Sequence, residues 1–145
     1  MNEKIDSKKA PEPIGAYPHA RRIGNLLFLS GVGPRMRGSK DIPGVVLAPD
    51  GSVETYDIAA QCDSCFENIK SVLEAAGSKF ENIVDVLVFL TDMRRDFKIY
   101  NERYAAWFAG EGKPNPARTT IEIPRLPQGG NAPIAIELKV IATVD

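Results

Sequence analysis

Two segments of the chain carry apolar side chains at the period of an α-helix. Between residues 57 and 77 the apolar positions recur at steps of three and four and form one stripe, with Asp57 suited to begin a helix and Gly77 to end it. A second helix is predicted near residues 96–109, where five aromatic side chains share one face: Phe97, Tyr100, Tyr104, Trp107 and Phe108. The chain therefore contains two amphipathic helices that each need a partner surface.

Strands are predicted at residues 26–30, 83–91, 118–123 and 134–144 from short apolar or alternating runs. The order of strand, helix, strand, helix, strand and strand predicts an α+β fold, with one mixed sheet and two helices on one of its faces. Residues 33–51 hold three prolines and four glycines, which predicts a long loop with at most one short strand. Residues 1–145 are expected to form a single domain, with the polar residues 1–12 as a frayed tail.

Some of these strands are apolar on both faces. In VDVLVFL, at residues 84–90, one set of alternate positions is entirely apolar and most of the other set is too, and LLFLS at 26–30 behaves in the same way. Two helices cover only one face of such a sheet, so the other face needs another copy of the chain. We expect a closed homo-oligomer, and a seam between subunits is a natural place for a pocket.

Composition and charge exclude several classes of function. The 145 residues are 43% hydrophobic and 26% charged with a net charge of −1, and no face dense in lysine and arginine is evident, so nucleic acid is not the expected partner. No apolar run is long enough for a membrane span, and the polar N-terminus does not resemble a secretory signal. With only two cysteines, a reduced cytoplasmic setting is expected.

A metal site is not expected from the available ligands. The chain has one histidine, His19, and a Cys-x-x-Cys pair, Cys62 and Cys65, that lies inside the first predicted helix on its apolar stripe. A redox pair needs a helix N-terminus, and zinc needs more ligands than these three residues supply. The cysteines are therefore predicted to be core residues, and no metal or other cofactor is expected.

Two charged residues lie within the last two predicted strands. Glu137 occupies the side of its strand opposite to the apolar positions, and Arg118 alternates with Thr119 in the strand before it. If the second face of the sheet is buried in a subunit seam, burial raises the pKa of Glu137 and suits it to act as a general base. Arg118 can then bind a substrate carboxylate through two hydrogen bonds. A plain surface ion pair explains the same pattern, and alternation alone does not choose between the two.

Several collinear motifs, spread from about residue 13 to residue 143, resemble those of the RidA family (YjgF/YER057c/UK114) of enamine/imine deaminases. They are PIGAYPHARRIGNLLFLSG, DVLVFLTD, YNERYAAWF, PARTTIEI and IAIELKVIA. The resemblance implies a chorismate-mutase-like α+β fold, a homotrimer, three clefts between subunits and a small carboxylate substrate. It also implies hydrolysis of a carbon–nitrogen bond without a cofactor.

The resemblance assigns roles to individual residues. It places the arginine that binds the substrate carboxylate at Arg118 and the glutamate that activates water at Glu137. The pocket tyrosine falls on Tyr17, and the small polar wall on Ser30 and Gly31.

Departures from the generalist pattern resemble the branch called 2-aminomuconate deaminase. Pro18-His19 follows the tyrosine, Thr119 replaces a cysteine, Arg94–Arg95 is an added basic pair, and the loop at 35–49 is longer. The implied reaction converts 2-aminomuconate and water to 2-oxohex-3-enedioate and ammonia.

That substrate carries two carboxylates and therefore needs a second cation. The candidates are Arg35, Arg37, Arg94 and Arg95. Each of them can equally be an ordinary surface charge in contact with solvent. Arg35 and Arg95, together with Phe97, are therefore candidate substrate-binding residues. His19 or Tyr17 is the candidate acid for the leaving nitrogen.

The sequence leaves three alternative functions open. The first is a generalist deaminase of 2-aminoacrylate-type imines, and the second is a non-catalytic trimer that binds 2-oxo acids. The third is RNA cleavage, against which the sequence pI of about 5.9 argues.

Overall fold

The computed structural model describes residues 2–110 and 114–145. Six strands form the main sheet in the order β1-β2-β3-β8-β6-β7, and β4 and β5 form a separate two-stranded sheet. The elements follow each other as β1 (Asn2–Ile5), β2 (Ala20–Ile23), β3 (Leu26–Leu29), β4 (Val45–Leu47), β5 (Val53–Tyr56), α1 (Ile58–Ala75), the 3₁₀ turn η1 (Phe80–Asn82), β6 (Ile83–Leu90), α2 (Met93–Phe108), β7 (Ala117–Glu122) and β8 (Ile136–Thr143).

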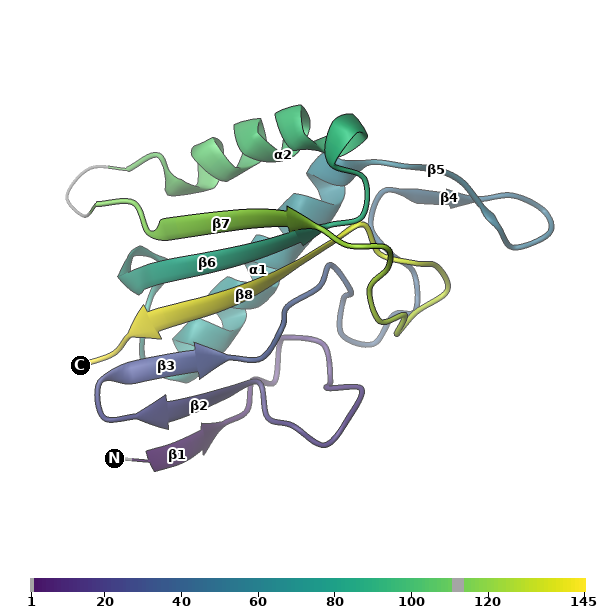
Figure 1. Cartoon of the computed structure of the whole chain (residues 1–145). Coiled ribbons are helices and arrows are strands. Elements are labelled where there is room, and N and C mark those ends of the chain that lie inside the picture. Colours follow the sequence, from purple (N-terminus) through teal and green to yellow (C-terminus); the bar gives the residue numbers. More distant parts are fainter. Residues whose placement is uncertain (1, 111–113) are drawn as a thin grey trace.

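The main sheet is mixed, and both helices cover the same face of it (Figure 1). Strands β6 and β7 pair in parallel, whereas β8 runs antiparallel to both β6 and β3. The prediction of an α+β fold with one mixed sheet and two helices on one face is therefore confirmed. The alternate residues of β8 that face the helices, from Ile136 to Ala142, are fully buried.

Helix α1 forms where the apolar period predicts it. The side chain of Asp57 accepts hydrogen bonds from the backbone N–H groups of Ala59 and Ala60, which satisfies two donors that a helix start leaves unpaired. Its buried face includes Cys62, Cys65 and the aromatic ring of Phe66. Both cysteines are fully buried free thiols, so the prediction that they belong to the core is confirmed.

The prediction of a frayed tail at residues 1–12 is wrong for the described part of that segment. Residues 2–5 form β1, which pairs antiparallel with β2 at the edge of the sheet. Backbone hydrogen bonding of this kind does not depend on apolar side chains, so a polar sequence gives no warning of it. Ile5 and Ala10 then bury their side chains and hold the segment, here called the N-terminal arm (residues 2–13), against the body of the protein.

The face of the main sheet that the helices leave open carries several exposed apolar side chains. Ile23, Phe28 and Ile121 are each more than a third exposed there, and Leu87 and Phe89 of β6 are partly exposed. The expectation that both faces of β6 carry apolar side chains is confirmed. An open apolar surface of this kind is typical of an interface.

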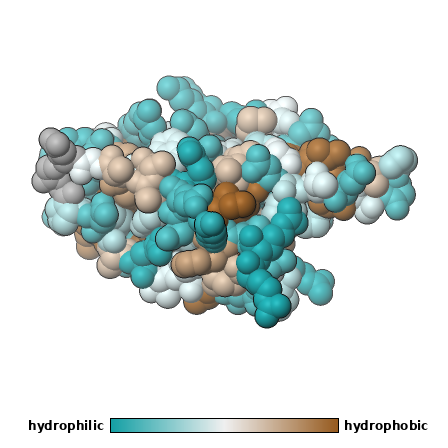
Figure 2. Space-filling view, turned by 90° about the horizontal axis from the view of Figure 1, so that it is seen from above, coloured by the Kyte–Doolittle hydropathy of each residue, from teal (hydrophilic) through white to brown (hydrophobic). Residues whose placement is uncertain are grey.

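The β4–β5 hairpin projects from one end of the molecule (Figure 1). The loop prediction for residues 33–51 correctly allowed one short strand, β4, but missed its partner β5. Val46 and Leu47 remain 52% and 38% exposed, and Figure 2 shows apolar surface at this projecting end.

Candidate functional site

The carboxylate of Glu137 lies directly against the backbone of Gly31. A Cβ atom added to Gly31 would stand 2.9 Å from Cδ and 3.0 Å from Oε2 of Glu137, closer than ordinary van der Waals contact. Glu137 projects from the open face of β8, because it pairs with Phe89 of β6 rather than with the helix-facing positions. Burial raises the pKa of this carboxyl group. A carboxylate with a raised pKa is suited to accept and return a proton.

Lys139 accompanies Glu137 on the same face of β8 and was missed by sequence reasoning. Its Nζ donates a hydrogen bond to the carbonyl of Leu29, where β3 ends, and burial lowers its pKa. The sequence pattern could have identified Lys139. In IAIELKVIA it lies two residues after Glu137, on the same face of the strand, and every other residue of this segment is apolar.

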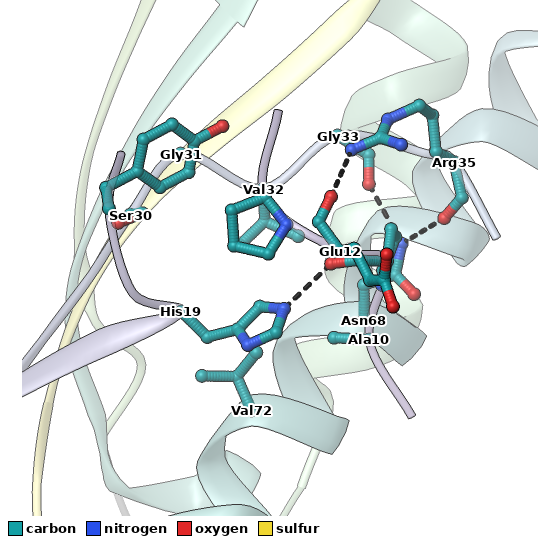
Figure 3. A pocket seen from close by; sticks show the side chains of 13 residues that line it. Ala10, Glu12, His19, Ser30, Gly31, Val32, Gly33, Arg35, Asn68 and Val72 are labelled. Carbon is teal, nitrogen blue, oxygen red and sulfur yellow. Dashed lines mark hydrogen bonds between the residues drawn. The ribbon is translucent and has the colours of Figure 1, made fainter. Parts of the chain in front are cut away.

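Beside Gly31 the chain forms a hollow that opens to solvent. Figure 3 shows its wall, to which the N-terminal arm, the end of β3 and helix α1 all contribute. The structure brings five predicted site residues together here: Tyr17, His19, Ser30, Gly31 and Arg35. Glu137 does not line this hollow, and Gly31 is the wall residue that contacts its carboxylate.

Two of the wall residues are fixed by backbone contacts. Ser30 donates its hydroxyl proton to the carbonyl of Pro18 at 2.7 Å, which ties the end of β3 to the segment that carries Tyr17. The hydroxyl of Tyr17 accepts a hydrogen bond from the N–H of Ile14, and its side chain remains substantially exposed. The phenol is therefore available at the mouth of the hollow.

His19 holds the N-terminal arm, and the geometry argues against its predicted role as the catalytic acid. Its Nδ1 accepts a hydrogen bond from the N–H of Ser7 at 3.0 Å, and Nε2 lies 2.7 Å from the carbonyl of Pro11. The Ser7 bond requires an unprotonated Nδ1, so Nε2 must carry the proton that bonds to Pro11. Both ring nitrogens are thus used by the arm, and the neutral ring has no proton directed at a substrate.

Asn68 of α1 is a second residue that sequence reasoning missed. Its side-chain amide donates to the carbonyls of Gly33 and Arg35, at 3.0 and 2.6 Å, and so fixes the loop that carries Arg35 (Figure 3). The only sequence signal was a polar residue between Phe66 and Ile69 on the buried stripe of the helix.

Arg118 and Glu137 do not meet within one chain. Arg118 pairs in register with Val86, which is buried under the helices, so it lies on the helix-covered face, whereas Glu137 lies on the open face. Two strand spacings and three residues along the strand put their Cα atoms about 14 Å apart. Within one subunit the two residues therefore do not share a cleft, and the expected cleft between neighbouring copies stays a prediction.

The guanidinium of Arg118 is held by helix α2. It lies 4.6 Å from the ring centre of Tyr104 and 5.4 Å from that of Tyr100, and it donates a 2.8 Å hydrogen bond to the side-chain carbonyl of Asn101. Because β7 is the last strand of the sheet, this arginine stands at an edge that a neighbouring molecule can reach.

Arg95 and Phe97, which were predicted to bind substrate, lie at the start of α2 and do not line the hollow beside Gly31. Arg95 stacks on the ring of Tyr56 at 3.7 Å and donates to its carbonyl, so it joins the hairpin to the helix. Phe97 is 39% exposed and contacts the ring of Tyr100. The ring of Tyr100 therefore contacts both Phe97 and Arg118.

Metal ligands do not gather anywhere in residues 2–110 and 114–145, where no group of three or more suitable side chains occurs. Burial raises the pKa of Cys62 to about 12 and that of Cys65 well above its usual range, so neither thiol forms a thiolate readily. No helix in the described part of the chain is long and apolar enough to cross a membrane.

Known proteins resemble this chain over almost its whole length. A RutC family protein of Pyrococcus horikoshii is 39% identical over 142 residues, which cover 98% of both chains. The Escherichia coli K12 protein named 2-iminobutanoate/2-iminopropanoate deaminase is 32% identical over 142 residues, again with 98% of both chains covered.

Solved structures agree with these relatives. The crystal structure of the Escherichia coli YjgF gene product superimposes with a TM-score of 0.81 at 31% identity, and that of Escherichia coli TdcF with bound serine with 0.81 at 28% identity. Each comparison covers 99% of both chains. The family model described as Endoribonuclease L-PSP matches residues 7–144. The chain therefore belongs to the Endoribonuclease L-PSP family, which is the family of the RidA/YjgF proteins.

Proposed function

We propose that this protein hydrolyses the carbon–nitrogen bond of a small enamine or imine carboxylate. The observation that carries the proposal is the position of Glu137, whose partly buried carboxylate with a raised pKa lies against Gly31 at the wall of an open hollow. Two relatives support the substrate class. One is named 2-iminobutanoate/2-iminopropanoate deaminase, and the other was crystallised with serine, a small carboxylate.

The proposed reaction needs one base that also returns its proton. An enamine first tautomerises to the imine, and Glu137 then removes a proton from a water molecule whose oxygen forms a bond to the imine carbon. The nitrogen takes up the electron pair of the C=N bond and receives protons from Glu137 and from Tyr17, which replaces His19 as the proposed second donor. The C–N bond then breaks, ammonia leaves, and loss of the hydroxyl proton gives the 2-oxo acid.

We propose 2-aminomuconate as the preferred substrate, with 2-oxohex-3-enedioate and ammonia as products. A generalist deaminase of imines with one carboxylate is the alternative. The experiment measures ammonia release by the purified protein from freshly generated 2-aminomuconate and from 2-iminobutanoate, each against its spontaneous hydrolysis. A much higher kcat/KM for 2-aminomuconate supports the proposal, whereas equal values favour the generalist. Tight binding of 2-oxobutyrate without any ammonia release would instead indicate a non-catalytic binding protein.

We further propose that three copies of the chain assemble and that Arg118 of one copy completes the site at Glu137 of the next. Two observations support this arrangement: the open apolar face of the sheet, and the location of Arg118 at its edge on the opposite face from Glu137. Arg118 would then bind the substrate carboxylate beside the reacting carbon.

Subunit complementation tests this arrangement. The variants Arg118→Ala and Glu137→Gln should each be inactive alone. When they are unfolded together and refolded at equal concentration, random trimers contain some clefts with both native residues, so activity should return to about a quarter of the native value. Continued inactivity of correctly assembled mixtures would place both residues of a working site in the same subunit.

Two further points follow from the composition. A cytoplasmic location is proposed, because the chain has only two cysteines and both are buried free thiols. RNA cleavage, which the description of the family model suggests, is not proposed, because the net charge is −1 and RNA binding needs a concentrated basic surface.

A further inference from the structure

Of the four cations that were candidates for binding a second carboxylate, three are placed poorly for it. Arg95 is engaged by the ring and carbonyl of Tyr56, and Arg94 lies exposed on α2, outside the hollow. Arg37 pairs with the carboxylate of Glu12 and also donates to the carbonyl of Lys8. The structure therefore uses Arg37 to hold the N-terminal arm.

Arg35 differs from these three arginines in position and in pairing. It lines the hollow together with Tyr17, Ser30 and Gly31 (Figure 3). Its guanidinium donates one hydrogen bond, at 3.0 Å, to the backbone carbonyl of Glu12, and within residues 2–110 and 114–145 it makes no ion pair. Because Arg37 takes the carboxylate of Glu12, the positive charge of Arg35 is not neutralised by the arm.

Contact with the backbone of Gly129 also fixes the position of the Arg35 side chain. It lies across the backbone of Gly129, where an added Cβ atom would stand 2.8 Å from Nε and 3.1 Å from Cζ of the arginine. Gly129 has no positive φ, so an alanine is compatible with its backbone and would displace the arginine instead. From the other side, Asn68 fixes the carbonyl of Arg35 on helix α1. A cation held in this way is preorganised to bind an anion.

We propose that Arg35 binds the carboxylate of the substrate that is remote from the reacting carbon, and that it thereby selects dicarboxylates over monocarboxylates. This inference rests on the proposed deamination and adds the residue that sets its substrate class. The second carboxylate displaces the carbonyl of Glu12 from Arg35 or shares the guanidinium with it, since the guanidinium has five N–H donors.

A binding experiment tests the assignment without any need for turnover. Muconate and sorbate share the same six-carbon diene, but only muconate has a carboxylate at both ends, so isothermal titration with each ligand isolates the second carboxylate. The native protein should bind muconate about 10- to 100-fold more tightly than sorbate, the range expected for one charge-assisted contact. Arg35→Ala should reduce muconate affinity to that of sorbate and leave sorbate unchanged.

Two variants make the result specific. Gly129→Ala keeps Arg35 but moves its guanidinium, and it should reduce the preference for muconate in the same direction as Arg35→Ala. Arg94→Ala removes an equal charge outside the hollow and should leave both affinities unchanged. Equal losses of muconate and sorbate binding in Arg35→Ala, or an unaltered preference, would overturn the proposal.

The kinetic counterpart separates this proposal from the proposed function. If the protein is a deaminase and Arg35 has the stated role, Arg35→Ala raises KM for 2-aminomuconate about 10- to 100-fold. The same variant should change KM for 2-iminobutanoate by no more than about twofold. If the native protein hydrolyses neither substrate, the proposed function fails, while the muconate and sorbate titrations still decide whether Arg35 binds a second carboxylate.

Discussion

Replacing Gly31 by alanine should reduce activity without unfolding the protein. The new methyl group would lie 2.9 Å from Cδ, 3.0 Å from Oε2 and 3.2 Å from Oε1 of Glu137, whereas ordinary contact begins at 3.4 Å. The carboxylate must therefore move by at least about 0.5 Å, because the glycine backbone is held by the neighbouring bridge between Val32 and Leu138. Gly31 does not have a positive φ, so alanine adds no backbone strain.

The size of the effect follows from this displacement. A misplacement of about 1 Å in a catalytic group reduces rate by about 100-fold, so a shift of about half that distance should lower kcat by about tenfold. The cost in folding free energy should stay within about 1–2 kcal/mol, since the atoms that must move are the end of a flexible side chain. Ammonia release under substrate saturation gives kcat, and urea denaturation gives the free energy of unfolding.

Two controls make this prediction decisive. Gly33→Ala, in the same loop, meets Cδ1 of Ile134 at 3.1 Å instead of the carboxylate, so it should change stability slightly and kcat little. In a protein that already carries Glu137→Ala, Gly31→Ala should cost almost no further folding free energy, because the carboxylate that the new methyl group would meet is absent. A fully active Gly31→Ala protein, or additive losses in the double variant, would refute the reasoning.

Three further predictions concern stability and the arm. His19→Phe replaces the ring by another aromatic ring but removes both of its hydrogen bonds to the arm, so the free energy of unfolding should fall by about 1–3 kcal/mol. The dependence of kcat on pH should stay unchanged. If the fall in kcat on one side of its pH optimum disappeared in this variant, His19 would be restored as the catalytic acid. Asp57→Ala removes the cap of α1 and should cost about 1 kcal/mol in urea denaturation, whereas Asp57→Ser should retain most of it. Glu137→Gln should raise Tm at neutral pH, because burial raises the pKa of Glu137 and its ionised form therefore destabilises the folded state. Below the pKa that Glu137 has in the unfolded chain, the carboxyl group is protonated in both the folded and the unfolded state, so the gain in Tm should vanish in acid. A gain in Tm that persists in acid would contradict the raised pKa of Glu137.

The periodic elements could be predicted because burial imposes their pattern. The stripe that predicted the first helix is the buried face of α1, and the two-sided apolar run at residues 84–90 is all of β6 except its first residue. The N-terminal strand β1 could not be found in this way. It is held by backbone pairing with β2 and by contacts of the arm with His19 and Arg37, none of which leaves a pattern in NEKI.

The relative position of Arg118 and Glu137 could not be predicted from the sequence. Alternation tells which residues share a face within one strand, and it correctly placed Glu137 away from the buried side of β8. It does not tell which face of β7 is continuous with which face of β8, because that depends on pairing and register with β6 between them. For this reason alternation alone does not show that Arg118 and Glu137 lie on opposite faces of the sheet within one subunit.

The central claim is that Glu137 activates water for attack on an imine. It is tested most directly by comparing ammonia release from freshly generated 2-iminobutanoate in the presence of the native protein and of Glu137→Gln, at equal concentration and with intact assembly of both. The account predicts rapid release by the native protein and release at the spontaneous rate with the variant. Equal rates with both proteins, above the spontaneous rate, would contradict it.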